Sequence, residues 1–214
     1  MIRNVLQCDD DNVCGVSGRA LNEGFADVAA IGTDLSFSRP LPWLIGEDAF
    51  SSGLAFRSAA GPVSINSASR DFWAERSWKK VSENGAHLNA TILSHAYYLL
   101  LNGGYHYRAG AGSIPSILVP AVGRVKAERI FYGTLFAPGL GQSPTFLNVK
   151  EITRNRALAL YGQTEQNATT LAWDAVGVTP CSTIPAVPTL QAEEMCPWWK
   201  LTLYAVAGAT TYHS

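Results

Sequence analysis

The sequence predicts a mainly α-helical protein, in which a helical bundle is preceded by a loop-rich segment and followed by a short tail. Three observations predict this class. Apolar residues recur at intervals of three and four over several long stretches, which is the period of an amphipathic helix. Residues 36–84 are rich in Ser and Gly and hold no sustained period, which is typical of loops. Residues 200–207, KLTLYAVA, alternate as a β-strand does.

The first helix is expected over residues 20–35, because Pro40 and Pro42 forbid its continuation. Most of its residues are suited to burial: Leu21, Phe25, Ala26, Val28, Ala29, Ala30 and Ile31. Within this apolar stretch, Glu23 and Asp27 stand four residues apart and therefore share one helix face. Two carboxylates on a partly buried face are costly unless a cation lies opposite them. The sequence therefore predicts a cation that faces Glu23 and Asp27.

Four further helices are expected over residues 89–101, 122–136, 145–161 and 166–178. They end at glycine and proline residues, which stop helices. The stripes expected to be buried in the second and third of these are Val122, Val125, Ala127, Ile130, Phe131 and Leu135, and then Phe146, Val149, Ile152, Ala157 and Leu160. His95 lies in an apolar stretch of the first and is expected to be structural.

Composition excludes several classes of function. The chain has 214 residues, 47% hydrophobic and 15% charged, which is typical of a globular protein with a sizeable core. A formal net charge of −1 without a run of Lys or Arg argues against nucleic acid or an anionic membrane surface as partner. No apolar run approaches the roughly 20 residues that span a bilayer. The first residues lack the apolar centre of a secretion signal.

The four cysteines form two local pairs, Cys8 with Cys14 and Cys181 with Cys196. Four cysteines permit three disulfide connectivities, and the sequence does not choose among them. The local pairing is the simplest and would fit an oxidising compartment. Neither pair has C-x-x-C spacing, which argues against a cysteine zinc site.

Three stretches, found together and in order, carry a family resemblance. They are ALNEGFADVAA at 20–30, WLIGEDAF at 43–50 and ENGAHLNATILSHAYYLLLNGG at 83–104. Together they resemble the thermolysin-like neutral zinc metallopeptidases, and the later helices resemble that family's C-terminal helical domain. The resemblance covers residues 14–178. It implies an N-terminal segment at 1–13, which ends before or at the family's zinc-binding helix, and a proline-rich linker with a possible strand at 179–214.

The resemblance implies metal ligands. In this family a zinc ion is held by two His and one Glu. Glu23 matches the Glu, and Asp27 matches an acid that orients a zinc-bound histidine. The alternative is that Glu23 and Asp27 meet an Arg or Lys side chain. Glu47 and Asp34 fall where the family has calcium-binding acids, so calcium is a second implied cofactor.

The resemblance also implies residues that contact substrate. Arg57 resembles the arginine that binds the substrate carbonyl, a task suited to its fork of donors. His87 resembles the histidine that hydrogen-bonds the developing oxyanion. Asn84, three residues earlier, falls in the same substrate-binding stretch. The implied ligand is a peptide or protein, and the implied location is extracellular.

One motif of the family is absent from this sequence, and its absence affects which function is expected. The H-E-x-x-H helix that supplies two ligands and the base ends roughly 20 residues before the third ligand, which falls at MIRNVLQ here. That stretch contains neither His nor Glu. We therefore expect a peptidase-derived domain that is incomplete alone and that an N-terminal peptidase domain could complete in trans. The alternatives are a non-catalytic peptide-binding module and an unrelated hydrolase that uses His87 with Glu83.

Overall fold

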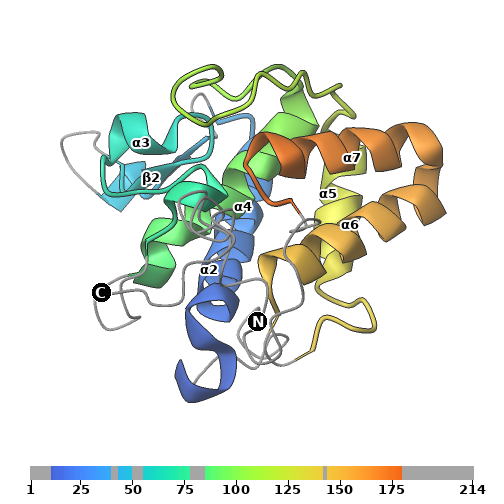
Figure 1. Ribbon diagram of the computed structural model, residues 1–214, viewed down its shortest axis with the longest axis horizontal. Helices are drawn as coiled ribbons and strands as arrows, with labels where there is room; N and C mark the ends of the chain where they lie inside the picture. Colours follow the sequence, from blue (N-terminus) through green and yellow to red (C-terminus); the bar gives the residue numbers. More distant parts are fainter. Residues whose placement is uncertain (1–10, 40–42, 50–54, 78–84, 142–143, 180–214) are drawn as a thin grey trace, which may run out of the picture.

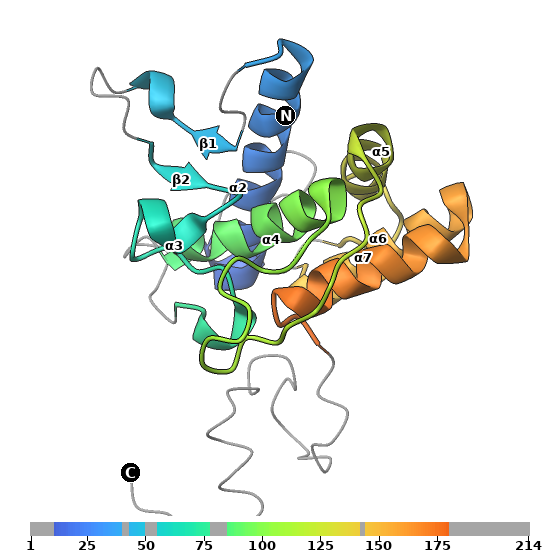
Figure 2. The ribbon, with the colours of Figure 1, turned by 90° about the horizontal axis from the view of Figure 1, so that it is seen from above.

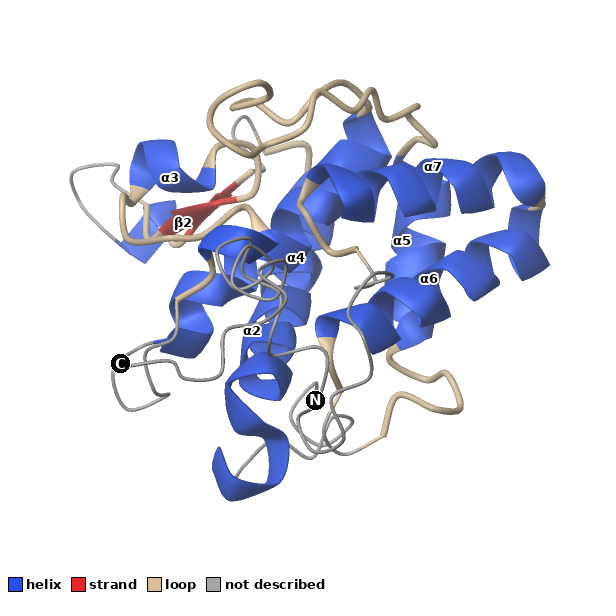
Figure 3. Cartoon of the chain, in the orientation of Figure 1, coloured by secondary structure: helices blue, strands red, loops and turns tan. Residues whose placement is uncertain are grey.

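The computed structural model describes residues 11–39, 43–49, 55–77, 85–141 and 144–179, without the side chains of residues 11–15. Within this part the chain is mainly helical, as the sequence predicts (Figures 1 and 3). The α-helices are α2 Asp11–Ser36, α3 Pro62–Ile65, α4 Gly85–Asn102, α5 Arg124–Thr134, α6 Phe146–Tyr161 and α7 Gln163–Ala175. No described helix is both long and apolar enough to cross a bilayer.

Helices α2 and α4 lie against each other at the centre of the molecule (Figures 1 and 2). Gly24 allows this approach, because a Cβ built there would lie 2.9 Å from the carbonyl oxygen of Ala90 and 3.0 Å from the Cβ of Leu93. Both neighbours belong to α4. The missing side chain therefore brings the acid-bearing turn of α2 close to the first turns of α4.

The core is centred on Phe131 of α5, which contacts aromatic rings from three other helices. Its ring centroid lies 6.5 Å from that of Phe25 on α2, 5.2 Å from that of Tyr97 on α4 and 6.0 Å from that of Trp173 on α7. All four side chains are fully buried. Large buried aromatics contribute strongly to core stability, so this group joins four helices into one core.

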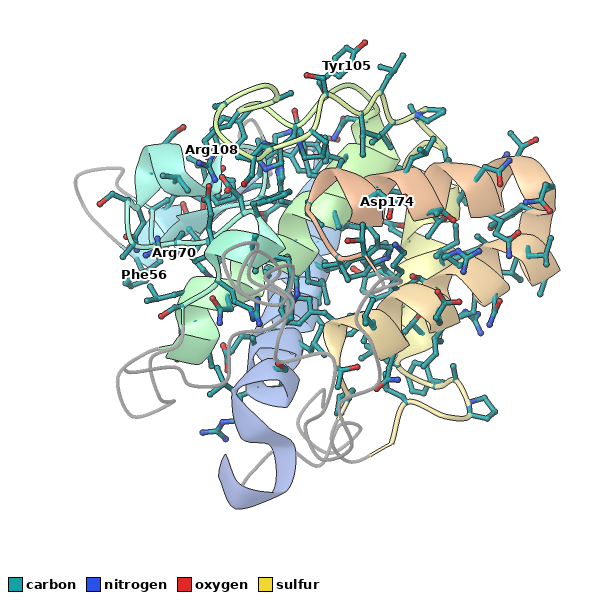
Figure 4. The ribbon with its side chains drawn as sticks, in the orientation of Figure 1. Phe56, Arg70, Tyr105, Arg108 and Asp174 are labelled. Atoms are coloured by element: carbon teal, nitrogen blue, oxygen red, sulfur yellow. The ribbon has the colours of Figure 1, made fainter. Side chains whose placement is uncertain are left out.

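Helices α6 and α7 form a tight antiparallel pair (Figures 1 and 2). Gly162 alone separates them and has φ of 103°, a conformation that only glycine adopts readily. At the far end, the buried Nζ of Lys150 donates to Asp174 Oδ1 at 2.5 Å and to the Val178 carbonyl at 2.7 Å. Figure 4 shows Asp174 on α7 above α6. The pair is thus fixed at both ends.

The segment expected to be loop-rich contains structure that the sequence analysis missed. Strand β1, Leu44–Ile45, pairs antiparallel with β2, Arg57–Ser58, and Ile45 lies opposite Arg57. The short helix α3 follows, and two 3₁₀ turns lie at Glu47–Ala49 and Trp73–Glu75. Two-residue strands are too short to show alternation, so no period in the sequence could reveal them.

Other expectations differ in position. Helix α2 begins at Asp11, nine residues before its predicted start, and α4 begins at Gly85 instead of 89. An acidic residue such as Asp11 is favoured in the first turn of a helix, which accounts for the earlier start of α2. Val125 and Leu160 were expected to be buried but are 62% and 45% exposed. The predicted tail strand lies outside the described residues.

Candidate functional site

The acid-bearing turn of α2 holds a buried ion pair. Asp27 has 2% of its side chain exposed and accepts two hydrogen bonds from Arg57. Arg57 Nε donates to Oδ2 at 2.9 Å and Nη2 donates to Oδ1 at 2.5 Å. Such a bidentate pair is both strong and directional. The cation that faces Asp27 is therefore a guanidinium, which is the alternative that the sequence left open beside a metal-bound imidazole.

Asp27 and Arg57 each change the pKa of the other. Burial raises the pKa of Asp27, and the hydrogen bonds from Arg57 oppose this shift without cancelling it. For Arg57 burial alone would lower the pKa, but its hydrogen bonds to Asp27 raise it above its ordinary value. The guanidinium therefore stays charged across the whole physiological range.

One turn earlier, Glu23 meets a histidine from α4. His87 Nδ1 lies 3.3 Å from Glu23 Oε2, and 49% of the His87 side chain is exposed against 27% for Glu23. The charges of Glu23 and His87 also act on Asp27. The four side chains Glu23, Asp27, Arg57 and His87 thus form one electrostatic group, which we call the α2 cluster. Its members come from one helix face, a strand and a second helix.

Three backbone elements position the α2 cluster. Glu23 and Asp27 share a face of α2 by their spacing. Arg57 lies on β2, and β1, its partner strand, packs against α2. The α4 end is fixed by the buried Asn89, whose side chain accepts from Ser77 N at 2.7 Å and donates to Ser77 O at 2.9 Å. The sequence analysis missed this role of Asn89, although a polar residue in an apolar helix stretch signals it.

The α2 cluster leaves donors and acceptors available for a ligand. Arg57 Nη1 makes no hydrogen bond within the described part of the chain, and 18% of the Arg57 side chain is exposed. His87 uses Nδ1 toward Glu23, which leaves Nε2 without a hydrogen bond among the described residues. A guanidinium edge and an imidazole nitrogen are suited to a carbonyl oxygen. The cluster therefore offers groups that are chemically suited to a carbonyl oxygen.

The predicted calcium-binding acids lie on two different elements. Glu47 lies in the first 3₁₀ turn and Asp34 near the end of α2. Among the described residues no group of three or more His, Cys, Asp or Glu side chains could hold a metal ion. Asn84, Glu83 and the cysteine side chains of Cys8, Cys14, Cys181 and Cys196 lie outside the described residues.

A second polar group, the buried histidine cluster, is formed by Asp71, His95, His106, Tyr107 and Arg108. His95 is fully buried, and its Nδ1–H donates to the Ala59 carbonyl at 2.7 Å. Its Nε2 has no hydrogen-bond partner in the described part of the chain. Its ring centroid lies 4.5 Å from that of His106. Burial lowers the pKa of His95 to about 3 and also lowers that of His106. His95 is thus buried and neutral, in keeping with a structural role.

The acid of this cluster is satisfied by its neighbours. Asp71 accepts from Tyr107 Oη at 2.5 Å and from Arg108 Nε at 3.2 Å. Burial alone would raise the pKa of Asp71, but the hydrogen bonds from Arg108 and Tyr107 lower it below its ordinary value. Arg108 also reaches Glu75 at 2.7 Å. Figure 4 labels Arg108 beside α3, at the start of the long loop that leads from α4 to α5.

The fold is a helical bundle in which two acids on one helix face contact an arginine from a strand and a histidine from a second helix. A model of the family described as thermolysin metallopeptidase, alpha-helical domain, matches residues 15–178. The chain therefore belongs to the thermolysin metallopeptidase family, as the three quoted stretches predict.

Individual relatives agree with this assignment. A thermolysin from Alicyclobacillus acidocaldarius subsp. acidocaldarius is 31% identical over 164 residues, which are 74% of this chain and 28% of that protein. A bacillolysin from Bacillus cereus is 30% identical over 166 residues, 74% of this chain and 27% of that protein. The chain thus spans little more than a quarter of the length of these relatives.

A solved structure shares the fold. The precursor of protealysin, a metalloproteinase from Serratia proteamaculans, superposes with a TM-score of 0.58 and 24% identity. The match covers 76% of this chain and 50% of that chain.

Proposed function

We propose that this chain is the helical half of a thermolysin-like zinc endopeptidase and that it supplies one wall of the active-site cleft. In this proposal Glu23 is a metal ligand, Asp27 holds Arg57 in place, and Arg57 and His87 bind the substrate peptide. The observation that carries the proposal is the α2 cluster itself. Residues that the family resemblance selected from three separate segments are in contact or one helical turn apart.

The described residues do not fit a zinc ion by themselves. A catalytic zinc site needs three protein ligands. The α2 cluster offers one carboxylate that Arg57 does not bind, that of Glu23, because both oxygens of Asp27 accept hydrogen bonds from Arg57. The sequence contains no H-E-x-x-H motif in residues 1–214. The remaining ligands would therefore come from a polypeptide outside this sequence, such as an N-terminal peptidase domain.

The residues of this chain would then bind and orient the substrate. Asp27 holds the Arg57 fork through two hydrogen bonds, so the free edge of the guanidinium meets a carbonyl with little loss of side-chain entropy. His87 would approach the same carbonyl from α4 through Nε2. A calcium ion at Glu47 and Asp34, and an extracellular location, belong to the same proposal and rest on the family resemblance.

Complementation tests the proposal. The chain would be refolded with a second chain that carries an H-E-x-x-H helix from a bacillolysin, and zinc-dependent casein hydrolysis would be measured. We expect hydrolysis only when both chains are present. Glu23→Gln should abolish it, whereas Glu151→Gln on the distant, exposed part of α6 should not. Equal hydrolysis by the Glu23→Gln variant would contradict the role of Glu23.

A zinc titration of the isolated chain tests separately whether its metal site is incomplete. With a single carboxylate ligand, no tight stoichiometric binding is expected by calorimetry. Tight one-to-one binding would show that this chain holds a complete metal site.

A non-catalytic peptide-binding module is the second candidate. It is favoured by the contacts that both acids of α2 make within the chain, Asp27 with Arg57 and Glu23 with His87, because acids that are engaged by the chain's own side chains need no metal. A peptide pull-down that is lost in His87→Ala and Arg57→Ala, with no hydrolysis after complementation, would support this module. A peptide pull-down that is unchanged in both variants would exclude a peptide-binding module at the α2 cluster. The third alternative, His87 with Glu83, stays a prediction, because Glu83 lies outside the described residues.

A further inference from the structure

An open pocket of about 380 Å³ lies between α5 and α6. These helices and the strands β1 and β2 lie on opposite sides of α2 (Figures 1 and 2). Arg129, Tyr132, Gly133 and Phe136 line the pocket from α5 and the residues after it, and Arg156 and Leu160 line it from α6. We call it the α5–α6 pocket. It shares no residue with the α2 cluster.

Arg156 lies flat against α5 because residue 133 has no side chain. A Cβ built at Gly133 would overlap the guanidinium of Arg156. Its Nε is buried and has no hydrogen-bond partner among the residues that the structure describes. An unpaired buried donor costs free energy, so an acceptor that reaches Arg156 would gain an interaction that the chain itself does not supply.

The charges of the α5–α6 pocket are unbalanced toward positive. Neither Arg129 nor Arg156 forms an ion pair with any acid in the described part of the chain. The one acid at the pocket, Glu128, already accepts a hydrogen bond from Arg124 Nε at 2.7 Å. Two guanidinium groups without counter-ions therefore face the same open space.

The walls of the pocket are apolar and exposed. Phe136 is 74% exposed and Leu160 is 45% exposed. Tyr132 adds the face of a ring, while its hydroxyl is held by the Val28 carbonyl at 3.2 Å. Leu160 was expected to belong to the buried face of α6 but is exposed at this pocket. An apolar surface beside unpaired arginines is suited to a ligand that is part ring and part anion.

We propose that the α5–α6 pocket binds a small aryl carboxylate, with the carboxylate on Arg156 and Arg129 and the ring against Tyr132, Phe136 and Leu160. Guanidinium forks match carboxylates by paired hydrogen bonds. The volume suits a small ligand, whereas a stable protein partner needs about 800 Å² on each side. The proposal stands independently of the peptidase function.

The test is a calorimetric or NMR titration of the full chain with 3-phenylpropionate. Saturable one-to-one binding is expected, at least tenfold tighter than that of the uncharged 3-phenylpropionamide and of propionate, which lacks the ring. Arg156→Gln should weaken binding at least tenfold. Gly133→Ala should also weaken it, because the new methyl group displaces the guanidinium.

Arg154→Gln is the matched control, because Arg154 also lies on α6 but bonds to Glu151 and Thr170. It should leave the affinity unchanged, and a thermal melt of each variant checks folding. Absence of saturable binding, equal binding of the amide, or unchanged affinity in Arg156→Gln would overturn the proposal. Binding of acidic peptides but not of the small acid would overturn it in favour of a protein-docking surface.

Discussion

Asp27 is a nearly fully buried carboxylate whose charge is matched by one side chain. Its partner Arg57 approaches from a two-residue strand, and only 2% of Asp27 is exposed. Arg57→Ala would leave that charge buried and unpaired. We expect the free energy of unfolding to fall by about 3–5 kcal/mol, measured by urea denaturation.

An exposed ion pair provides the matched control for the loss of stability expected in Arg57→Ala. Arg39 and Asp48 also form an ion pair, but their side chains are 42% and 78% exposed. Arg39→Ala should therefore cost less than about 1 kcal/mol. Adding Asp27→Asn to Arg57→Ala should restore part of the stability, because the unpaired charge is then gone. Equal losses from Arg39→Ala and Arg57→Ala would contradict the importance of burial.

His95 makes stability depend on pH. Its pKa is lowered from 6.5 to about 3 by burial, so the unfolded state binds the proton more readily than the folded state. Stability should therefore rise with pH between about 3 and 6.5 and should be fully present above pH 6.5. From one residue alone we expect a loss of about 2 kcal/mol at pH 5 relative to pH 7, measured by urea denaturation at each pH.

His95→Asn tests the source of this dependence. An asparagine amide can donate to the Ala59 carbonyl in place of Nδ1–H but does not titrate. The variant should show a smaller loss between pH 7 and pH 5. A slope that is the same in His95→Asn and in the unaltered protein would assign the pH dependence to other groups, His106 among them.

At the level of elements, the contact between α2 and α4 rests on Gly24. A methyl group at this position would meet the Ala90 carbonyl and Leu93. Gly24→Ala should gain about 1 kcal/mol of helix propensity and lose about 1–3 kcal/mol from overpacking. We expect a net loss of stability by urea denaturation, together with altered NMR signals of His87. Ala30→Gly, at an exposed position of α2, should change stability by propensity alone. Unaltered His87 signals in Gly24→Ala would contradict the packing argument.

Elements with a long period were predictable, and short ones were not. The stripes of α5, α6 and α7 place each helix within three residues of its observed ends. Strands β1 and β2 have two residues each and carry no pattern. The start of α2 was missed because an aspartate run is compatible with both a loop and a helix start. Exposure of Val125 and Leu160 could not be read from spacing, because an apolar residue at a helical position does not reveal whether a neighbour covers it.

The site was predictable only in part. The spacing of Glu23 and Asp27 indicated that a cation must face them, and Arg57 does so for Asp27. The choice of Arg57 and His87 depended on the family resemblance, because nothing in their local sequence links them to α2. The buried histidine cluster was not foreseen, since it joins residues more than 30 positions apart through loops. The roles of Glu23, Arg57 and His87 in a reaction stay predictions.

Over the whole molecule, burial predicts an order of local stability. Helix α4 is buried along nearly its full length, whereas β1 is only half-buried and β2 pairs with it through two residues. Amides of 93–101 should therefore exchange slowest in hydrogen-exchange mass spectrometry, and those of 43–49 and 55–58 fastest among the described segments. Faster exchange in α4 than in the strands would show that α4 is not the centre of the fold.

The one-residue connection at Gly162 limits where insertions and deletions can occur in the chain. Around this residue a Cβ would meet nothing within 4 Å, so the constraint is its φ of 103° and not a lack of space. One residue joins two helices whose far ends are held together, Trp173 to Thr153 and Asp174 to Lys150. Residues inserted at Gly162 would therefore have to form a longer corner without shifting one helix along the other. Changes of length should destabilise the protein more at this corner than in the non-helical stretch 137–141.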